Sequence, residues 1–547
     1  MRSRFHSLAF NALCLAASLS IAPRVAAQGC DSHHDDESAE MRDMAGKKIR
    51  WRHRDRMPDR IENVRLLAIN DFHGNLSAGR LVSGRPVGSA PVLAAYLEQA
   101  ADGAEDAAFI VHAGDHVGAS PPVSALLQDE PSISFLNLMA NRSCSEWFRG
   151  NPFCNIVGTL GNHEFDEGKG ELLRLLYGGD HPKGPFLEKH WRGAVYPVVS
   201  ANVVKTGTDK TLLPPFSIKF AHGMPIAFIG AVLKQTPTIV TPTGVEGLSF
   251  LDEAAAINKQ AAFLRKLGVR AMVVLIHQGG FQPAYTGPTD SASAPLTGEI
   301  RGIVQNLSDD IDAVVSGHTH AFSNAIVKNR NGKAMLVTQS FSAGTAFGQI
   351  DLELDRKTRD VVGMSGQIIT TWADQGPGLV PDPKVRAMVD KAEAVVAPLV
   401  NRVIGTADAA ITAAQNAAGE SALGNLIADA QRASVNADFG FMNPGGIRAD
   451  LNAGTIAWGA LFTIQPFAND VVKMTLTGAQ IYTLLNQQWA GQASPRMLQV
   501  SGLTYTWDDS LPVGSKVTEV RRAGTPIGLS DLFTIHYAVE GRVVRLN

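Results

Sequence analysis

The chain has 547 residues, of which 45% are hydrophobic and 18% are charged, and its formal net charge is −3. This length is enough for two or three domains, each with its own hydrophobic core. The near-neutral charge gives no overall field that would attract the protein to a nucleic-acid polymer or an anionic membrane, so we expect any nucleotide contact to be local. The sequence shows no internal repeat and no transmembrane segment, and it carries no indication of an oligomeric state.

The first residues predict an export signal. The chain begins with the basic run Met1-Arg2-Ser3-Arg4, followed by an apolar stretch at residues 8–22 that is short for a membrane span. A small-residue cleavage signal, Val25-Ala26-Ala27, comes next. We therefore expect residues 1–27 to be a signal peptide cut after Ala27, and the mature protein to be periplasmic or secreted. Lipid anchoring through Cys30 is the weaker alternative, because no aliphatic residue stands ahead of this cysteine.

Residues 28–60 are dense in charge and poor in aliphatic side chains, so we predict a disordered leader. Three cysteines remain once the signal is removed: Cys30, Cys144 and Cys154. The last two flank a turn-rich loop that a disulfide could close in an oxidising compartment, and two free thiols are the alternative.

The remaining chain divides into two predicted domains. Across residues 61–372, short apolar runs alternate with helix-like stretches such as 90–101 and 251–267, a pattern typical of layered α/β structure. The pattern then breaks into Gly, Pro and Asp, and a helix-like run follows, so we interpret residues 373–400 as a linker and connecting helix. Residues 401–547 have their own helix-like and strand-like segments and predict a second, smaller α/β domain.

Five short polar segments carry the chemistry of the predicted first domain. They are Asn70-Asp71-Phe72-His73-Gly74-Asn75, Gly114-Asp115, Gly161-Asn162-His163-Glu164-Phe165-Asp166, His277 and Gly317-His318-Thr319-His320. Nearly every one follows an apolar run that predicts a buried strand: residues 64–69, 109–111, 156–160, 272–276 and 312–315. In sheets covered on both faces, ligands bind at the carboxyl ends of the strands, so these distant side chains can converge there.

The side chains in these segments predict a dinuclear metal site. In extended backbone, Asp71 and His73 would point to the same face and offer a carboxylate beside an imidazole, which suits Zn, Mn, Fe or Co better than Ca. We expect Gly317 to give a flexible start to the turn that follows it. A single tetrahedral ion that keeps an open position would not normally bind four imidazoles, so two ions are the simpler interpretation. The four imidazoles are those of His73, His277, His318 and His320.

Four further residues complete the predicted chemistry. Two neighbouring cations need an anionic bridge, for which Asp115 is the natural candidate, and Asn162 can serve as a neutral oxygen ligand. Such ions would lower the pKa of a water between them and hold it in line with a phosphorus atom. His163 follows Asn162, and Asp166 lies three positions further on. A histidine oriented by a carboxylate could stabilise the transferring phosphoryl group or protonate the leaving oxygen.

These motifs resemble the calcineurin-like metallophosphoesterases, and specifically the two-domain 5'-nucleotidase family, which also includes UDP-sugar hydrolases and cyclic-nucleotide phosphodiesterases. The resemblance covers about residues 64–537. It implies a four-layer metallophosphoesterase sandwich followed by a smaller α/β 5'-nucleotidase C-terminal domain. It also implies that His163 and Asp166 form a catalytic dyad. It implies two divalent metal ions, Zn, Mn or similar, with Asp115 as the ligand that bridges them. By the same resemblance, one ion is held by Asp71, His73 and His320, and the other by Asn162, His277 and His318.

The second domain resembles the substrate-binding domain of that family, in the segments at residues 420–426 and 443–448. Arg448 follows a glycine turn and is a fixed fork for a phosphate or carboxylate, and Asn443 can hydrogen-bond a base edge. Phe467 matches the aromatic residue on which the nucleobase stacks. Without the resemblance, Phe467 would be assigned to the core and Arg448 to a surface ion pair.

Two features depart from the family pattern. Pro444 stands where many members carry a small residue, which restricts the backbone. The family normally supplies a second stacking Phe and a Gly-Gly-Asp turn near the C-terminus, but no Phe follows Phe533 in this sequence. We therefore expect a truncated or frame-shifted end that leaves half of the base-binding sandwich.

The sequence thus predicts an exported phosphohydrolase that converts nucleotides to nucleoside and phosphate. A UDP-sugar hydrolase or a 2',3'-cyclic-nucleotide phosphodiesterase is the alternative within the same class. A nucleotide- or metal-binding protein that has lost catalysis is the alternative from a different class, and the intact pair of His163 and Asp166 argues against it.

Overall fold

The computed structural model describes residues 60–104, 107–467, 469, 471–491 and 495–538. The predicted signal peptide, residues 28–59 of the predicted leader with Cys30, and residues 539–547 of the atypical C-terminus lie outside the described residues. Within the described part of the chain, no helix combines the length and the apolar character needed to cross a membrane.

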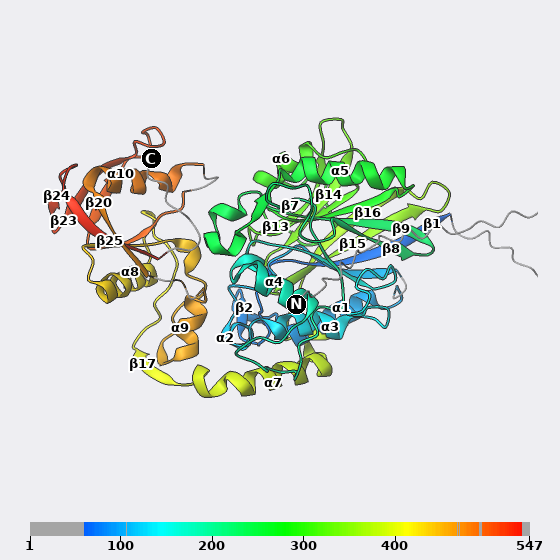
Figure 1. The fold of residues 1–547 in the computed structure, drawn as a ribbon, viewed down its shortest axis with the longest axis horizontal. Helices are drawn as coiled ribbons and strands as arrows, with labels where there is room; N and C mark the ends of the chain where they lie inside the picture. Colours follow the sequence, from blue (N-terminus) through cyan, green and yellow to red (C-terminus); the bar gives the residue numbers. More distant parts are fainter. Residues whose placement is uncertain (1–59, 105–106, 468, 470, 492–494, 539–547) are drawn as a thin grey trace, which may run out of the picture. The chain divides into compact units, whose positions relative to one another are not determined.

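Two six-stranded mixed sheets form the centre of the larger domain (Figure 1). In spatial order, the first sheet contains β16 (Val361–Thr370), β15 (Ala346–Asp355), β1 (Ile61–Ile69), β4 (Ala108–His112), β5 (Ile156–Thr159) and β6 (Val198–Val199). The second contains β13 (Phe322–Lys328), β14 (Ala334–Ser340), β12 (Ala313–Val315), β11 (Ala271–His277), β9 (Met224–Val232) and β8 (Phe216–Ala221). Strands β1, β4, β5 and β6 run parallel, and so do β9, β11, β12 and β14. Their carboxyl ends therefore share one edge of each sheet.

Smaller elements complete this domain. Two separate two-stranded antiparallel pairs accompany the sheets, namely the hairpin of β2 (Arg80–Val82) with β3 (Arg85–Val87), and β7 (Val203–Lys205) with the distant β10 (Leu248–Phe250). The helices are α1 (Ala90–Ala101), α2 (Pro122–Ala125), α3 (Glu130–Met139), α4 (Gly168–Tyr177), α5 (Glu253–Lys266), α6 (Glu299–Gln305) and α7 (Pro383–Val400). The helix-like stretch 90–101 of the sequence coincides with α1, and 251–267 contains α5.

Alternating side chains divide the domain into four layers. In β1, Leu66 and Ala68 belong to a core that also contains residues of the second sheet, such as Leu275. The intervening Leu67 and Ile69 pack on the other side, in the core that contains α1, α3 and α4. The outer face of the second sheet packs in the same way against α5 and α6. Because successive strand residues point to opposite faces, this alternation produces the predicted helix–sheet–sheet–helix sandwich.

The predicted connecting helix, α7, is packed against the larger domain. The Asp382 carboxylate accepts the backbone N–H of Val385, and Pro383 occupies the first turn, so the start of the helix is well capped. The apolar face of α7 is buried in the core that contains α1 and α3, through Val385, Val389, Ala392 and Val396. The helix is therefore anchored on the first domain along its length.

The smaller domain is built on a four-stranded sheet of β20 (Val471–Thr477), β25 (Leu532–Ala538), β18 (Phe439–Met442) and β21 (Gln499–Ser501). Phe439 and Phe441 of β18 pack with α10 (Gly478–Asn486), and Met442 packs with α8 (Ala422–Val435), so each helix covers one face. The remaining elements are α9 (Trp458–Ile464), the pair β17 (Val403–Ala407) and β19 (Gly454–Ala457), and the sheet of β22 (Thr504–Trp507), β23 (Val517–Arg522) and β24 (Thr525–Pro526).

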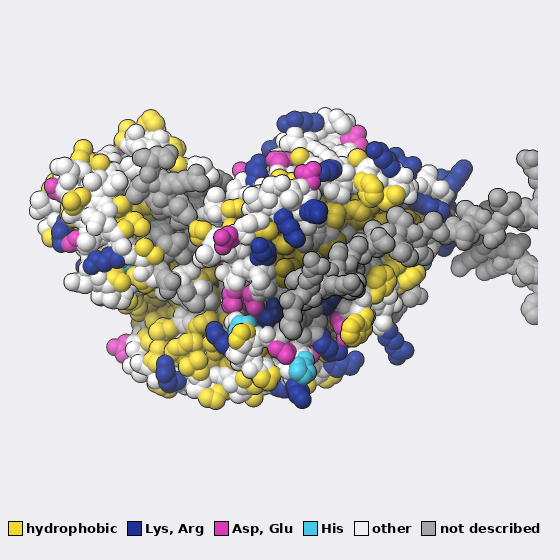
Figure 2. All heavy atoms as spheres, viewed as in Figure 1, with side chains coloured by type: hydrophobic (Ala, Val, Ile, Leu, Met, Phe, Trp, Pro, Cys, Tyr) yellow, Lys and Arg dark blue, Asp and Glu magenta, His cyan; other side chains and the backbone are white. Residues whose placement is uncertain are grey.

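Charged side chains of both signs lie on the face drawn in Figure 2. On the face drawn in Figure 2, lysine and arginine side chains alternate with acidic ones. This mixture agrees with the formal net charge of −3. The face shown therefore offers no continuous basic field of the kind that binds a polyanion.

The disulfide between Cys144 and Cys154 is present, so of the two sequence alternatives the disulfide is confirmed. The Arg149 guanidinium, inside the loop, donates hydrogen bonds to the backbone carbonyls of Ala194, Arg192 and Glu146. The bond and this clamp together fix the loop on the body of the domain.

Removing the disulfide should lower stability measurably. We expect Cys144→Ala to reduce the free energy of unfolding by about 2–3 kcal/mol, because the bond closes a loop of about ten residues and restricts the unfolded chain. Urea unfolding of the wild type and the variant, each with and without dithiothreitol, measures this. The reductant should lower the stability of the wild type alone. Equal unfolding midpoints for all four samples would show that the bond contributes nothing.

Candidate metal centre

The five polar segments meet at the carboxyl ends of the parallel strands. The predicted metal ligands lie as follows: Asp71 and His73 directly after β1, Asp115 after β4, Asn162 after β5, His277 at the end of β11, and His318 and His320 after β12. The structure thus brings all seven together from both sheets. Their carboxylate and imidazole atoms form three overlapping groups that could each hold a metal ion: Asp71 with His73 and His320, Asp115 with His277 and His318, and Asp115 with His73 and His163.

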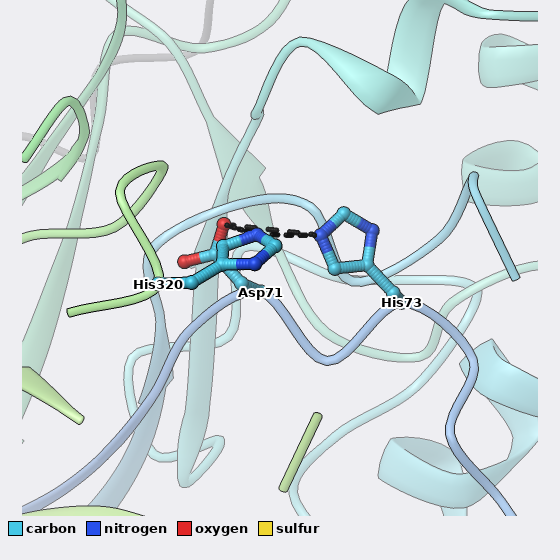
Figure 3. Close-up of side chains that lie close together, drawn as sticks. All are labelled: Asp71, His73 and His320. Atoms are coloured by element: carbon cyan, nitrogen blue, oxygen red, sulfur yellow. Dashed lines mark hydrogen bonds and ion pairs between the residues drawn. The ribbon is translucent and has the colours of Figure 1, made fainter. Parts of the chain in front are cut away.

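The first group is drawn in Figure 3. His320 Nε2 lies 3.2 Å from Asp71 Oδ1 and 3.1 Å from His73 Nε2. His73 Nδ1 lies 2.9 Å from the carbonyl oxygen of Gly118. When Nδ1 carries the proton and donates it to that carbonyl, the Nε2 lone pair faces the carboxylate. Three donor atoms therefore converge on a small region.

The second group contains Asp115, His277 and His318. His277 Nε2 lies 2.9 Å from Asp115 Oδ2, while its Nδ1 is 2.7 Å from the carbonyl oxygen of Ala113. His318 Nδ1 is 3.0 Å from Asn162 Oδ1. Asp115 Oδ2 is also 3.8 Å from His73 Nε2, so this carboxylate lies between the two groups. Asp115 is therefore within reach of both groups, and so is Asp71, whose Oδ1 lies 3.8 Å from His277 Nε2.

The backbone at these residues corrects one sequence-based expectation. Asp71 and His73 are not extended: their φ angles are 48° and 47°, in the left-handed region that residues other than glycine rarely adopt. Asp115, His318 and His320 share this conformation, with φ of 47°, 73° and 54°. Each ligand is thus turned into the site by its own local bend rather than by strand alternation. Five such residues in one place store strain of the kind that surrounding structure must hold.

Gly317 also acts differently from the prediction. The left-handed residues in this turn are the two histidines, whereas Gly317 does not have positive φ. A Cβ atom at this position would lie 3.0 Å from Asp71 Oδ2, from His277 Nδ1 and from the carbonyl oxygen of Ala113. Glycine is therefore needed here for the close approach of the ligands, and not for turn flexibility.

The electrostatics fit bound cations. Asp71 and Asp115 are almost fully buried, and the nearby imidazoles hold the pKa of each carboxyl below its usual value in spite of burial. Burial opposes protonation of His277, but Asp115 and Asp71 outweigh it and raise the pKa of His277 to about 9. His277 Nε2 is buried and, within the part of the chain that the structure describes, has no hydrogen-bond partner of normal geometry. Buried carboxylates and imidazoles that face one another in this way are a donor set for divalent zinc or manganese.

His163 and Asp166 form the predicted pair. His163 Nδ1 lies 2.7 Å from Asp166 Oδ2, and the backbone N–H of His163 donates to Asp115 Oδ1 at 2.9 Å. Burial disfavours the charged imidazole, yet the Asp166 and Asp115 carboxylates raise the pKa of His163 to about 10. The imidazole is therefore oriented by Asp166 and favours the protonated form beside the metal ligands.

Two residues that hold the ligands in place were not predicted from the sequence. The buried Glu164 carboxylate accepts the backbone N–H groups of Asp115, His116 and Gly161, at 3.0, 2.8 and 2.5 Å. It thereby ties the loop after β4 to the loop after β5. Asn70 donates to Asp71 Oδ2 at 2.8 Å and accepts the backbone N–H of Ser340 at 2.8 Å. Both residues lie inside the metal-binding sequence motifs, and this position was the only indication of their role that the sequence offered.

Glu164 gives a test of this support. We expect Glu164→Gln to weaken metal binding by about 10–100-fold, because a single amide oxygen cannot replace a carboxylate that accepts three N–H groups around Asp115. Calorimetric titration of metal-free protein with Mn²⁺ measures the affinity. Glu171→Gln is the matched control, since Glu171 pairs with Arg174 on α4. Equal affinities for the wild type and Glu164→Gln would exclude this positioning role.

Of the three predicted substrate-binding residues, Arg448 and Phe467 lie against residues of the metal centre. Arg448 Nη2 lies 3.4 Å from His73 Nε2, and its guanidinium is 5.7 Å from the Phe467 ring centroid. The Phe467 ring stacks on His163, with ring centroids 5.6 Å apart. Asn443 comes directly before the short turn Pro444–Gly446 that leads to Arg448. Phe533 is a core residue, buried against Phe439 at a centroid distance of 4.9 Å.

Comparison with known proteins assigns both halves of the fold. The calcineurin-like phosphoesterase family model matches residues 64–322, and the model of the 5'-nucleotidase C-terminal domain matches residues 403–538. Endonuclease YhcR of Bacillus subtilis is 36% identical over 493 residues, which are 89% of this chain and 37% of that protein. Cell wall protein Lmo0130 of Listeria monocytogenes is 36% identical over 503 residues, covering 85% of this chain and 61% of that protein. The chain thus spans less than two thirds of the length of each of these relatives.

The solved structures agree. The structure of a 5'-nucleotidase precursor from Thermus thermophilus is 25% identical, has a TM-score of 0.70, and covers 87% of this chain and 89% of its own. It is similar over both domains, and the two family models match in the same order along the chain. The chain therefore belongs to the calcineurin-like, metal-dependent phosphoesterases whose catalytic domain is followed by a 5'-nucleotidase C-terminal domain.

Proposed function

We propose that this protein is a dinuclear-metal phosphohydrolase that removes phosphate from nucleotides, in the manner of a 5'-nucleotidase. The observation that carries the proposal is the pair of His163 and Asp166 at 2.7 Å beside a buried cluster of carboxylates and imidazoles. Arg448 and Phe467 of the smaller domain contact the same cluster. A catalytic group, a metal site and two groups suited to a nucleotide therefore occur together.

The metal ligands are assigned by this proposal as two sets that share Asp115. When bound, the two ions would activate a water and neutralise the charge on the phosphoryl oxygens. Asp115 suits the shared position because it lies within 3.8 Å of His73 Nε2 and 2.9 Å of His277 Nε2. One set consists of Asp71, His73 and His320, and the other of Asn162, His277 and His318.

His163 and Asp166 would act on the phosphoryl group and on the leaving oxygen. Asp166 binds Nδ1 of the imidazole, so Nε2–H is the atom free to face the substrate. The high pKa of His163 favours a proton on this atom at neutral pH. The imidazolium can then stabilise negative charge on the phosphoryl oxygens and protonate the leaving oxygen.

The smaller domain would recognise the nucleotide. Arg448 provides a planar fork for phosphate oxygens, and Asn443 a hydrogen-bonding group for the base. One face of the Phe467 ring is covered by His163, so a base would stack on the other face. Such stacking contributes about 1–3 kcal/mol for any base, which suits a nucleotide enzyme of broad base tolerance.

We propose that the protein acts outside the cytoplasm, in the periplasm or as a secreted enzyme. The Cys144–Cys154 disulfide supports this, because such bonds persist in oxidising compartments. The similarity to a protein named as a cell wall protein points in the same direction.

A substrate panel tests the function. The purified protein would be assayed for phosphate release from AMP, UDP-glucose, 2',3'-cAMP and p-nitrophenyl phosphate, with added Mn²⁺ or Zn²⁺ and again with a chelator. We expect AMP to be hydrolysed in the presence of metal and not in the presence of chelator. Preferred hydrolysis of UDP-glucose or 2',3'-cAMP would favour the alternative activities. Loaded metal without any phosphate release would identify a binding protein and refute the proposal.

A further inference from the structure

A small cavity of about 210 Å³ adjoins the metal centre, and the arginines that line it give it a positive charge. Its polar lining includes two predicted metal ligands, two arginines, an amide and a hydroxyl: His73, His320, Arg80, Arg448, Asn75 and Thr463. Among the described residues that line it, none is Asp or Glu. The cavity therefore offers hydrogen-bond donors and positive charge to whatever occupies it.

Arg80 is held in this cavity by the metal-binding loop itself. Its Nε donates to Asn75 Oδ1 at 2.8 Å, and Asn75 Nδ2 in turn donates to the carbonyl oxygens of Phe72 and His73, at 2.8 and 3.0 Å. Among the described residues, the two terminal nitrogens of this guanidinium form no hydrogen bond, so they can donate to another acceptor. An arginine fixed through one nitrogen keeps its fork in a defined orientation.

The hairpin that carries Arg80 is also fixed. Arg80 pairs with Val87 across strands β2 and β3, and Val87 is buried. On the same hairpin, Arg85 lies over the Trp372 ring at 4.0 Å and pairs with Asp374 at 2.6 Å. Arg80 is thus carried by a β-hairpin that is attached to the body of the domain through Val87 and Arg85.

Arg80 and Arg448 lack the acidic partner that Arg85 has. Within the described residues, neither of them forms an ion pair with an Asp or Glu side chain. Burial and, to a smaller degree, the charge of Arg448 lower the pKa of Arg80. Two like charges that converge on one cavity are unfavourable until an anion lies between them. Phosphate, which accepts paired N–H groups from arginine, is the anion that fits a phosphoesterase.

We propose that Arg80 is a substrate-binding residue, which together with Arg448 binds the phosphate group next to the phosphoryl group under attack. This inference rests on the proposed function and assigns a preference for substrates with a phosphoanhydride, such as nucleoside diphosphates. Water attacks the terminal phosphorus, the bond from that phosphorus to the bridging oxygen breaks, and the leaving nucleoside monophosphate retains the electron pair. A proton of the water passes to solvent. Arg80 and Arg448 then stabilise the charge that develops on the leaving phosphate.

The kinetic test compares ADP with AMP. Because AMP has no second phosphate, Arg80→Gln should raise KM for ADP by at least about tenfold and change KM for AMP by less than about twofold. Arg80→Lys keeps the positive charge but loses the paired N–H groups of the guanidinium. Its KM for ADP should lie between those of the wild type and Arg80→Gln. The matched control is Arg330→Gln, an exposed arginine whose side chain forms no hydrogen bond or ion pair within the described residues. It should behave as the wild type with both substrates.

A binding measurement separates this inference from the proposed function. Inorganic pyrophosphate and inorganic phosphate would be titrated calorimetrically into metal-free wild type, Arg80→Gln and Arg330→Gln in the presence of chelator. Arg80→Gln should weaken pyrophosphate binding at least about tenfold. Arg80-dependent binding by a wild type that hydrolyses no nucleotide would refute the proposed function and leave the subsite in place. The assignment of Arg80 would be overturned by a different result. In that case the wild type hydrolyses AMP and ADP, and Arg80→Gln has the same two KM values and the same affinity for pyrophosphate.

Discussion

Replacing His163 with alanine is expected to lower kcat by about 10²–10⁴-fold, the range typical of a positioned general acid or base. The physical reason is that the imidazole, oriented by Asp166 at 2.7 Å, favours the protonated form and would stabilise the charge that develops on the phosphate. Metal content should remain that of the wild type, because the seven assigned ligands are intact. Steady-state assays with AMP and metal analysis of the same preparation give both numbers.

The chain offers a matched control for this variant. His190 Nδ1 lies 3.0 Å from Asp180 Oδ2, which reproduces the His163–Asp166 contact on the surface, where the His190 side chain is 71% exposed. His190→Ala should leave kcat unchanged. Asp166→Asn should cause a smaller loss than His163→Ala, since it misorients the imidazole without removing it. Full activity of His163→Ala would remove this residue from the mechanism.

Much of the scaffold that carries the site could be predicted from the sequence. The apolar runs 64–69 and 272–276 lie within β1 and β11, and the polar residues follow where the strands end. This works because a parallel strand buried on both faces needs a continuous apolar run, whose end is visible in the sequence. Glycine and histidine at the strand ends then indicate the chemistry.

The local geometry of the ligands could not be predicted, because distant segments impose it. The left-handed conformation of Asp71 is held by three contacts: its N–H donates to the carbonyl oxygen of Gly114, its own carbonyl accepts the N–H of Ala343, and its carboxylate accepts the N–H of His318. None of these partners is near Asp71 in the sequence. Local propensity favours an extended segment after β1, and tertiary hydrogen bonds override it.

The supporting residues were missed for the same reason. Glu164 bonds to N–H groups nearly 50 residues away, and the relation of Arg80 to Arg448 crosses from one domain to the other. A charged side chain in a motif indicates function, whereas its partner is fixed by the fold. The strained ligands are thus held in place by buried supports that come from distant segments of the chain.

Asp115→Asn should have the largest effect on the metal centre. The amide keeps the shape of the side chain but loses the negative charge that two neighbouring cations would share, so bound metal should fall from two ions per chain to one or none. Activity should drop by about 10³-fold or more, which exceeds the roughly 10–100-fold loss typical of residues that hydrogen-bond to the metal ligands. Metal analysis after exhaustive dialysis, together with AMP hydrolysis in excess Mn²⁺, measures both changes.

The control and the alternative outcome follow from where Asp115 lies. Asp115 Oδ2 is 2.9 Å from His277 Nε2 and 3.8 Å from His73 Nε2, so one substitution disturbs both groups of ligands. Asp71 is assigned to one set of ligands, although its Oδ1 also lies 3.8 Å from His277 Nε2, and Asp71→Asn should release one ion and retain the other. Asp209→Asn, at an exposed position, should keep full metal content and activity. If Asp115→Asn retained two ions, Asp115 would not be the shared ligand, and the two cations would have to be held without a common carboxylate.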